Sequence, residues 1–287
     1  MPTWTTVAEG VHQRRGGPFD LSVVVVEGAD GLLVVDAGGD PVEGAEILDD
    51  VRSRFDRPVL GLVNTHAHFD HTFGNQAFRT GVPDVAIHGH ALIAAHFARY
   101  EGPRLAAWRI DPSREPARAW ADVELMPPTH PLDEPVDLDL GARIVRLLPQ
   151  SPAHSDTDLV LFVPDARVWV LGDLVEESGP PMYGSGSYPL TWPDVLDELV
   201  AGMQDGDLVI PGHGAVVDRA FVARQSGELR VIAERLAAAH ALGVPTDGVL
   251  AAHAEWPFPA DGLVGAVERA YLALDGRPLH EGGAGDA

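Results

Sequence analysis

Three histidines and an aspartate lie within a six-residue stretch of the chain. His66, His68, Asp70 and His71 follow the apolar run Val59–Val63, which predicts a buried strand ending just before them. If the backbone stays extended there, His66, His68 and Asp70 point to one side and His71 to the other. Imidazole nitrogen and carboxylate oxygen are ligands that zinc accepts. The spacing therefore predicts a metal site and favours two neighbouring ions over one.

At three later positions, a possible metal ligand again lies next to an apolar run. His154 stands in a turn-rich segment that leads into the run Leu159–Val163, and Asp173 and the glycine-flanked His213 each end such a run. Loops held by a rigid sheet are where functional sites are usually built. Each position by itself is compatible with an ordinary turn, but their combination in one chain favours a shared site.

Over roughly residues 5 to 240, this pattern resembles the metallo-β-lactamase superfamily of hydrolases. The resemblance implies two zinc ions as cofactors, with iron or manganese as alternatives. It also implies a catalytic role for Asp70, which would orient the nucleophile or accept its proton. The early segment ending in Asp36 and Gly38 resembles a family strand that supports the ligand loop from behind. Asp36 is therefore predicted to support the metal-binding residues and not to bind metal itself. The resemblance assigns the two metal sites as follows: His66, His68 and His154 at the first, Asp70, His71 and His213 at the second, and Asp173 bridging them.

The expected fold is α/β (α+β). The alternation of strand-like and helix-like segments predicts mixed sheets with helices, and the family resemblance implies a four-layer αββα sandwich of two mixed β-sheets flanked by helices. We expect one domain over residues 1–275, mainly helical from about 218 to 275, and a disordered tail at 276–287. A helix is predicted to begin at Pro41 with Asp40 as its cap.

Two features separate this chain from other branches of the resembled superfamily. The oxygen-reducing branch has glutamate where this chain has His68, and one lactamase subclass uses cysteine where this chain has Asp173. We therefore expect a zinc-dependent hydrolase, in which a hydroxide bridging the metals attacks a small-molecule ester, thioester, lactone or lactam. A glyoxalase II-like thioesterase is a sharper version, although its Gly-His-Thr-x-Gly-His signature is absent. An iron-dependent sulfur dioxygenase-like enzyme and a non-catalytic metal-binding protein are the alternatives.

Substrate recognition is predicted for segments that leave the strands beside the site. Residues 101 to 135 show no clear periodicity of apolar residues and are interpreted as a functional lid or an edge insertion. In the loop 176 to 192, Tyr183, Tyr188 and Trp192 are candidates for lining the substrate pocket or forming a lid, although Trp192 fits packing on the following helix equally well. Met182 is expected to pack. Structural or surface roles are expected for the remaining histidines considered: His88, His90, His96, His130, His240 and His253.

Composition restricts the partners and the compartment. The formal net charge is −23, and all 20 basic residues are arginines. Such a chain repels phosphate backbones and anionic lipids, so a small-molecule substrate is expected, without nucleic acid or membrane partners; a homodimer is left open. The chain has no cysteine, which excludes disulfides and thiolate ligands. Because its start lacks a basic segment followed by an apolar one, a cytoplasmic location is expected.

Overall fold

The computed structural model describes residues 2–253 and 255–279. In this part of the chain, thirteen strands pair in the order β7-β6-β5-β4-β3-β12-β11-β10-β9-β8, with β2 attached to β3, β1 to β2 and β13 to β12. The strands are β1 (Thr3–Ala8), β2 (Val11–Gly16), β3 (Leu21–Glu27), β4 (Leu32–Val35), β5 (Val59–Val63), β6 (Ala86–His90), β7 (His130–Leu132), β8 (Val136–Asp139), β9 (Ile144–Pro149), β10 (Leu159–Val163), β11 (Val168–Glu176), β12 (Leu208–His213) and β13 (Val217–Asp218). The α-helices are α1 (Pro41–Arg54), α2 (Phe69–Thr72), α3 (Asn75–Gly81), α4 (Ile93–His96), α5 (Gly102–Ile110), α6 (Trp192–Gly202), α7 (Arg219–Ala241), α8 (Thr246–Val249) and α9 (Val264–Leu274).

The mixed sheet and its flanking helices agree with the α/β (α+β) prediction. Strands β4 to β7 pair in parallel, as do β11 and β12, whereas β1 to β4 and β8 to β11 pair antiparallel. The division into two separate sheets is not confirmed, because β3 and β12 pair where Leu21 lies opposite His213 and join both halves into one sheet.

Strand β3 illustrates how alternating side chains build the core. Successive side chains of a strand point to opposite faces. Val24 and Val26 pack with Leu147 and Leu161 in an apolar cluster shared by the two halves of the sheet. The intervening side chains of β3, those of Val23 and Val25, pack in another cluster with residues of α1. Because the side chains on both faces of β3 are buried, its sequence is a continuous apolar run.

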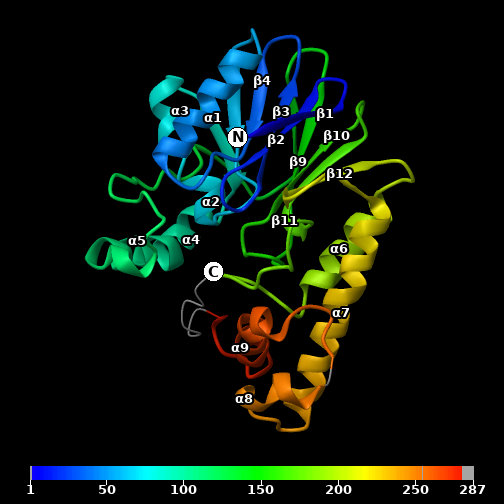
Figure 1. Ribbon diagram of the computed structural model, residues 1–287. Coiled ribbons are helices and arrows are strands. Elements are labelled where there is room, and N and C mark those ends of the chain that lie inside the picture. Colours follow the sequence, from blue (N-terminus) through cyan, green and yellow to red (C-terminus); the bar gives the residue numbers. More distant parts are fainter. Residues whose placement is uncertain (1, 254, 280–287) are drawn as a thin grey trace.

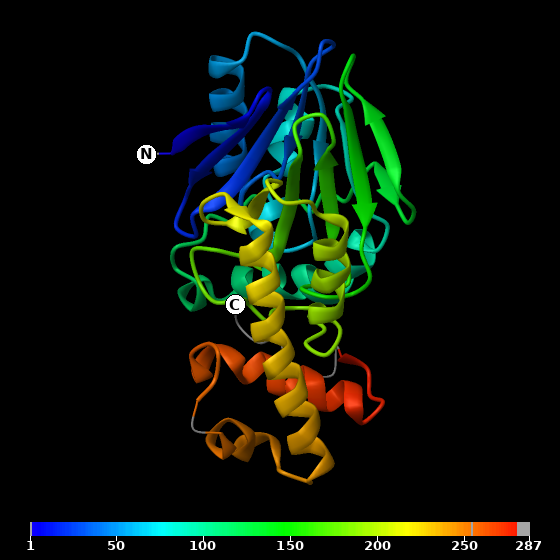
Figure 2. The same ribbon diagram turned by 90° about the vertical axis from the view of Figure 1, so that its right-hand side faces the viewer.

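Helices lie on opposite sides of the strands. In Figure 1, α1 and α3 lie along one side, and α6 and α7 along the other. Helix α1 begins as predicted, since Asp40 accepts hydrogen bonds from the backbone N–H groups of Val42 and Glu43 at 2.8 and 2.9 Å. Helices α8 and α9 lie beyond one end of the sheet, beside the far part of α7 (Figure 2).

Regular structure also occurs where the sequence did not predict it. Helix α5 and strand β7 lie within the segment from 101 to 135, and α4 connects to α5 through a π-helix at Phe97–Glu101. Only Leu105 and Trp108 of α5 are buried, which leaves too weak a periodicity to reveal the helix. The hairpin of β1 and β2 was missed as well, because its outer strand is largely exposed and its inner strand is polar.

Two further predictions concern the chain's end and membranes. Of the tail expected at 276–287, residues 280–287 lie outside the described residues, while the backbone N–H of Arg277 donates to the carbonyl of Leu272 at 2.8 Å. No helix among residues 2–253 and 255–279 combines the length and apolarity needed to cross a membrane.

Candidate metal centre

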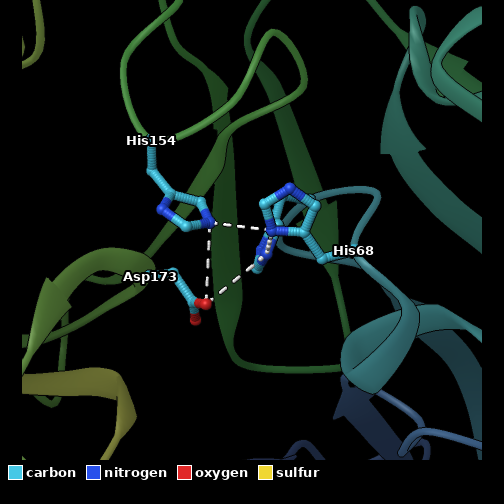
Figure 3. A group of neighbouring side chains, drawn as sticks. His68, His154 and Asp173 are labelled. Carbon is cyan, nitrogen blue, oxygen red and sulfur yellow. Dashed lines mark hydrogen bonds and ion pairs between the residues drawn. The ribbon is translucent and has the colours of Figure 1, made fainter. Parts of the chain in front are cut away.

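Three histidines and an aspartate from separate segments converge on one point. His66 and His68 lie between β5 and α2, His154 lies between β9 and β10, and Asp173 lies within β11. His68 Nδ1 lies 3.1 Å from His66 Nε2 and 2.9 Å from His154 Nε2. Asp173 Oδ2 lies 3.6 Å from each of these Nε2 atoms. Figure 3 shows three of these side chains pointing toward one another.

The spacing of these four atoms fits a tetrahedral cation. Ligands about 2.0 Å from a tetrahedral zinc lie roughly 3.3 Å from one another. The separations of 2.9 to 3.6 Å span that value. His66, His154 and Asp173 are buried and His68 is half-buried, so the group is largely withdrawn from water.

A second group lies directly beside the first. Asp70 and His71 belong to α2, and His213 ends β12. Asp70 Oδ2 lies 3.3 Å from His213 Nε2 and 3.7 Å from His71 Nε2, and the two imidazole nitrogens are 3.4 Å apart. The predicted ligands of the second metal therefore lie together, and their role as ligands stays a prediction.

Asp173 stands between the two groups. Its Oδ1 lies 3.1 Å from His71 Nε2, while its Oδ2 faces the first group and lies 3.4 Å from His213 Nε2. The neighbouring strand makes room for this carboxylate at Gly212, where an added Cβ would lie 1.8 Å from Asp173 Oδ1. This placement is the one that a bridging ligand needs.

Asp36 supports the ligand loop from behind, where the sequence predicted it. Its Oδ2 accepts hydrogen bonds from Nδ1 of His71 and from the hydroxyl of Thr65, both at 2.8 Å. The Thr65 hydroxyl lies 3.1 Å from Nδ1 of His66. These contacts occupy the Nδ1 atoms of both histidines and leave their Nε2 atoms facing the metal groups.

Backbone carbonyls orient two more histidines. His68 donates from Nε2 to the carbonyl of Ser185 at 2.9 Å, which leaves its Nδ1 facing the first group. His213 donates from Nδ1 to the carbonyl of Phe19 at 2.9 Å, which leaves its Nε2 facing the second group. The hydrogen bonds thus select the nitrogen that each imidazole presents, as in metal sites generally.

The first group is electrostatically suited to bind a metal. Burial, reinforced by the neighbouring imidazoles, lowers the pKa of His66 and His68 well below the ordinary value. For His154, burial together with His71 outweighs the opposing effect of Asp173, and its pKa falls to about 4. These imidazoles are therefore neutral at pH 7, which is the form that coordinates a cation.

The second group lies in a strongly negative environment. Burial opposes protonation of His71 and His213, but nearby carboxylates, above all Asp173, outweigh it and raise the pKa of both well above the ordinary value. A field that draws protons onto two buried imidazoles also attracts a divalent cation to the same place. Donor types, spacing and charge at both groups thus fit bound metal ions.

The sequence analysis missed Glu176, which ends β11. With Asp173 and His213 it forms a further group of possible metal donors, and it is buried. Burial and the nearby Asp173 raise its pKa well above the ordinary value. In the sequence, only its position three residues after Asp173 could have suggested that it belongs to the site. Strand β11 continues past Asp173 and ends at Glu176, which brings this carboxylate to the same group.

A pocket of about 290 Å³ opens beside both groups. Its walls combine predicted ligands, apolar side chains, two arginines and part of the loop 176 to 192. The lining residues are Phe19, His68, Phe69, Asp70, Arg104, Arg118, His154, Asp173, Glu176, Ser178, Gly179, Pro180, Met182, Gly184, Ser185 and His213.

The predicted contributions of this loop need correction, because Tyr183, Tyr188 and Trp192 do not line the pocket among the described residues. Trp192 is fully buried, and its ring packs against His154 with centroids 5.2 Å apart. Tyr183 packs on Trp192 with centroids 5.3 Å apart, and Tyr188 is half-buried and donates its backbone N–H to Ala153. Met182, expected to pack, is instead 41% exposed and lines the pocket.

A sequence profile of the metallo-β-lactamase superfamily matches residues 16–236, a range that includes every predicted ligand. The chain belongs to the metallo-β-lactamase superfamily. Membership and the buried donor groups together suggest divalent metal ions. Among the described residues, the six other histidines considered above take part in none of these donor groups.

Relatives within the superfamily carry different activities. The chain is 23% identical to a metallo-β-lactamase type 2 of Bacillus sp. (strain 170), over 69% of this chain and 68% of that one. It is 27% identical to an acyl-coenzyme A thioesterase of Gallus gallus, over 67% of this chain and 72% of that one. A linear primary-alkylsulfatase of Pseudomonas sp. (strain ATCC 19151) is 23% identical over 67% of this chain, but the match spans only 41% of the sulfatase.

Solved structures of the superfamily share the fold. A metallo-β-lactamase from Pontibacter korlensis superposes with a TM-score of 0.63 at 16% identity, covering 80% of this chain and 99% of that one. The sec-alkylsulfatase Pisa1 from Pseudomonas sp. gives a TM-score of 0.74 at 16% identity, covering 95% of this chain and 50% of the sulfatase. At this identity the likeness concerns the fold alone.

Proposed function

We propose that this protein is a hydrolase that holds two divalent metal ions, zinc in the first instance, and cleaves an ester, thioester, lactone or lactam bond of a small molecule. The observation that carries the proposal is the position of Asp173 between two groups of buried donors, with one carboxylate oxygen toward each. Metal ions held by these residues would lower the pKa of a bound water and polarise a carbonyl oxygen of the substrate.

The proposed role of Asp70 follows from its charge and position. Burial would raise its pKa, but His71 and His213 outweigh burial and lower it below the ordinary value. Asp70 is therefore ionised at neutral pH and acts as a hydrogen-bond acceptor. Because it also lines the pocket, we propose that it orients an attacking water or accepts its proton.

The pocket walls supply substrate binding. Phe19, Phe69 and Met182 form apolar surface around the metal groups, and such surface binds the apolar part of a substrate and displaces water from it. The relatives named above are a lactamase, a thioesterase and a sulfatase, which supports hydrolysis as the shared chemistry and leaves the bond open. We therefore include sulfate esters among the substrates to be tested.

Two measurements test the proposal. Elemental analysis of the purified protein is expected to give two divalent metal ions per chain, and the zinc-loaded protein is expected to hydrolyse one class of substrate. The panel contains a chromogenic cephalosporin, a homoserine lactone, an acyl-coenzyme A, an aryl ester and an alkyl sulfate. Asp70→Ala serves as the blank, and His130→Ala, at an exposed histidine outside the donor groups, is the matched control.

The alternatives give different results in the same measurements. One iron per chain with oxygen consumption would indicate a sulfur dioxygenase-like enzyme. Two bound metals without turnover of any substrate would favour a metal-binding protein without catalysis. The complete second donor group and the adjoining pocket are our reasons for preferring hydrolysis.

A further inference from the structure

Two arginines stand in the wall of the metal-site pocket. Arg104 and Arg118 both line it, and their side chains are only 17% and 16% exposed. Withdrawing a guanidinium group from water is unfavourable unless other groups stabilise it. In a chain with a formal charge of −23, two largely buried cations beside the candidate active site call for a specific explanation.

One carboxylate is shared between both cations. Glu115 accepts hydrogen bonds from Nε and Nη2 of Arg104 at 3.2 and 3.1 Å, and from Nε of Arg118 at 3.3 Å. These three groups carry a net charge of +1. Among the described residues, the terminal nitrogens of Arg118 have no hydrogen-bond acceptor.

Aromatic rings fix the arginines beside the metal groups. The guanidinium carbons of Arg104 and Arg118 lie 4.6 and 4.3 Å from the ring centroid of Phe69, and 5.2 and 5.6 Å from that of Trp120. Phe69 immediately precedes Asp70, so this stack places the positive charge next to the predicted ligands of the second metal. Groups held in this way lose little conformational freedom when a ligand binds.

The wall beside the arginines is apolar, and this restricts the kind of ligand that fits the pocket. The ring centroid of Phe19 lies 4.6 Å from the guanidinium carbon of Arg118, and Pro180 and Met182 line the same pocket. Among the described residues, a neutral apolar ligand would leave the terminal nitrogens of Arg118 without an acceptor, whereas an inorganic anion would leave the apolar wall uncovered. An organic anion with an apolar part matches both surfaces.

We propose that Arg104 and Arg118 form a binding subsite for the oxyanion of an amphiphilic substrate, that is, a carboxylate, sulfate or phosphate attached to an apolar group. Planar guanidinium groups recognise such oxyanions with paired, charge-assisted hydrogen bonds. Calling this ligand a substrate rests on the proposed hydrolase function, whereas its binding does not.

Calorimetric binding to the zinc-loaded protein tests the subsite without requiring turnover. The probes are octanoate, octyl sulfate and octyl phosphate below their micelle concentrations, with 1-octanol as the neutral match. At least one anion is expected to bind about tenfold or more tightly than octanol, because hydrogen bonds to charged groups contribute that much. The three anions distinguish which oxyanion is preferred. If octanol binds as tightly as every anion, the proposal is overturned.

Variants distinguish the arginines from the metals as the anion's partner. Arg104→Gln and Arg118→Gln are each expected to weaken anion binding about tenfold and to leave octanol binding and zinc content unchanged. Arg114→Gln removes the same charge at an exposed position outside the pocket and is expected to match the parent. Unchanged anion affinity in both pocket variants would overturn the proposal. If either glutamine variant does not fold, the lysine variant at that position, which keeps the charge, must bind the anion more tightly than octanol.

The same data separate this proposal from the hydrolase proposal. Arginine-dependent anion binding in a protein that hydrolyses nothing would support the subsite and count against the enzyme. Hydrolysis in a protein whose anion affinity ignores both substitutions would do the reverse.

Discussion

Asp36 accepts a 2.8 Å hydrogen bond from Nδ1 of His71, the imidazole whose Nε2 lies 3.1 Å from Asp173. The same carboxylate accepts hydrogen bonds from the backbone N–H and the hydroxyl of Thr65. Asp36 lies immediately after β4 and has a positive φ of 65°, a backbone conformation that residues other than glycine, asparagine and aspartate seldom adopt. This conformation lets one carboxylate hold both the ligand loop and a ligand.

Asp36→Asn is expected to weaken metal binding at the group that contains His71 by about 10- to 100-fold, the usual effect of removing a residue that orients a ligand. The amide has one acceptor oxygen, so it cannot serve Thr65 and His71 as the carboxylate does. Zinc titration against a competing chelator measures the loss. Asp122→Asn, at an exposed site, is the control, and parent-like affinity for both metals in Asp36→Asn would refute this role.

Asp70→Ala and His154→Ala are expected to lose metal from different groups. Each removes one donor, so metal content should fall by about one ion per chain, and activity by more than about a hundredfold, since even residues that merely support a ligand contribute that much. The fold should remain, because neither side chain belongs to the apolar clusters. Elemental analysis, circular dichroism and turnover measure these effects; full activity in either variant would contradict a two-metal mechanism.

Trp192→Ala is expected to reduce the free energy of unfolding by about 3 to 5 kcal/mol, because removing this fully buried side chain leaves a cavity in the core. Trp192→Phe keeps most of the volume but loses the 3.1 Å hydrogen bond from Nε1 to the carbonyl of Leu174, so a loss of about 1 kcal/mol is expected. Urea unfolding gives both values. A parent-like stability for Trp192→Ala, combined with an altered KM, would restore the substrate-lining interpretation.

Glu101 is expected to make folding stability depend on pH. Its carboxylate is buried without a hydrogen-bond partner among the described residues, and burial raises its pKa from 4.5 to about 7, against the opposing effects of Arg104 and His96. Its contribution is fully present below about pH 4.5 and is lost as the pH rises to about 7, because the unfolded chain ionises first.

Glu101→Gln keeps the neutral form at every pH and removes this dependence. The unfolding free energy of the variant should exceed that of the parent by less than about 1 kcal/mol near pH 5 and by on the order of 3 kcal/mol at pH 8. Urea unfolding of both proteins at each pH measures the difference, and any metal loss at low pH affects both alike. A difference that does not change between pH 5 and pH 8 would show that Glu101 has an ordinary pKa.

Local sequence determined the parts of this protein that depend on neighbouring residues. The apolar run Val59–Val63 forms β5, and His66 and His68 lie in the loop just beyond it as predicted. The extended backbone considered for the following residues is not found, because Asp70 and His71 lie in helix α2 and group together with His213. Asp40 caps α1 because its carboxylate bonds to backbone N–H groups only two and three residues ahead. Donor types and spacing favoured one shared site, the family resemblance divided its seven residues between two groups, and the structure brings these residues together with Glu176, which was missed.

Tertiary structure decided what depends on distant contacts. Leu21 pairs with His213 and turns two sets of strands into one sheet, which no local pattern records. The side chain of Trp192 points into the core, where its Nε1 donates to the carbonyl of Leu174 and its ring packs against His154. Met182 of the same loop lines the pocket instead. Side-chain direction in a loop without periodicity is set by such long-range packing. The sequence therefore indicated the candidate metal donors except Glu176, but not the side chains that line the pocket.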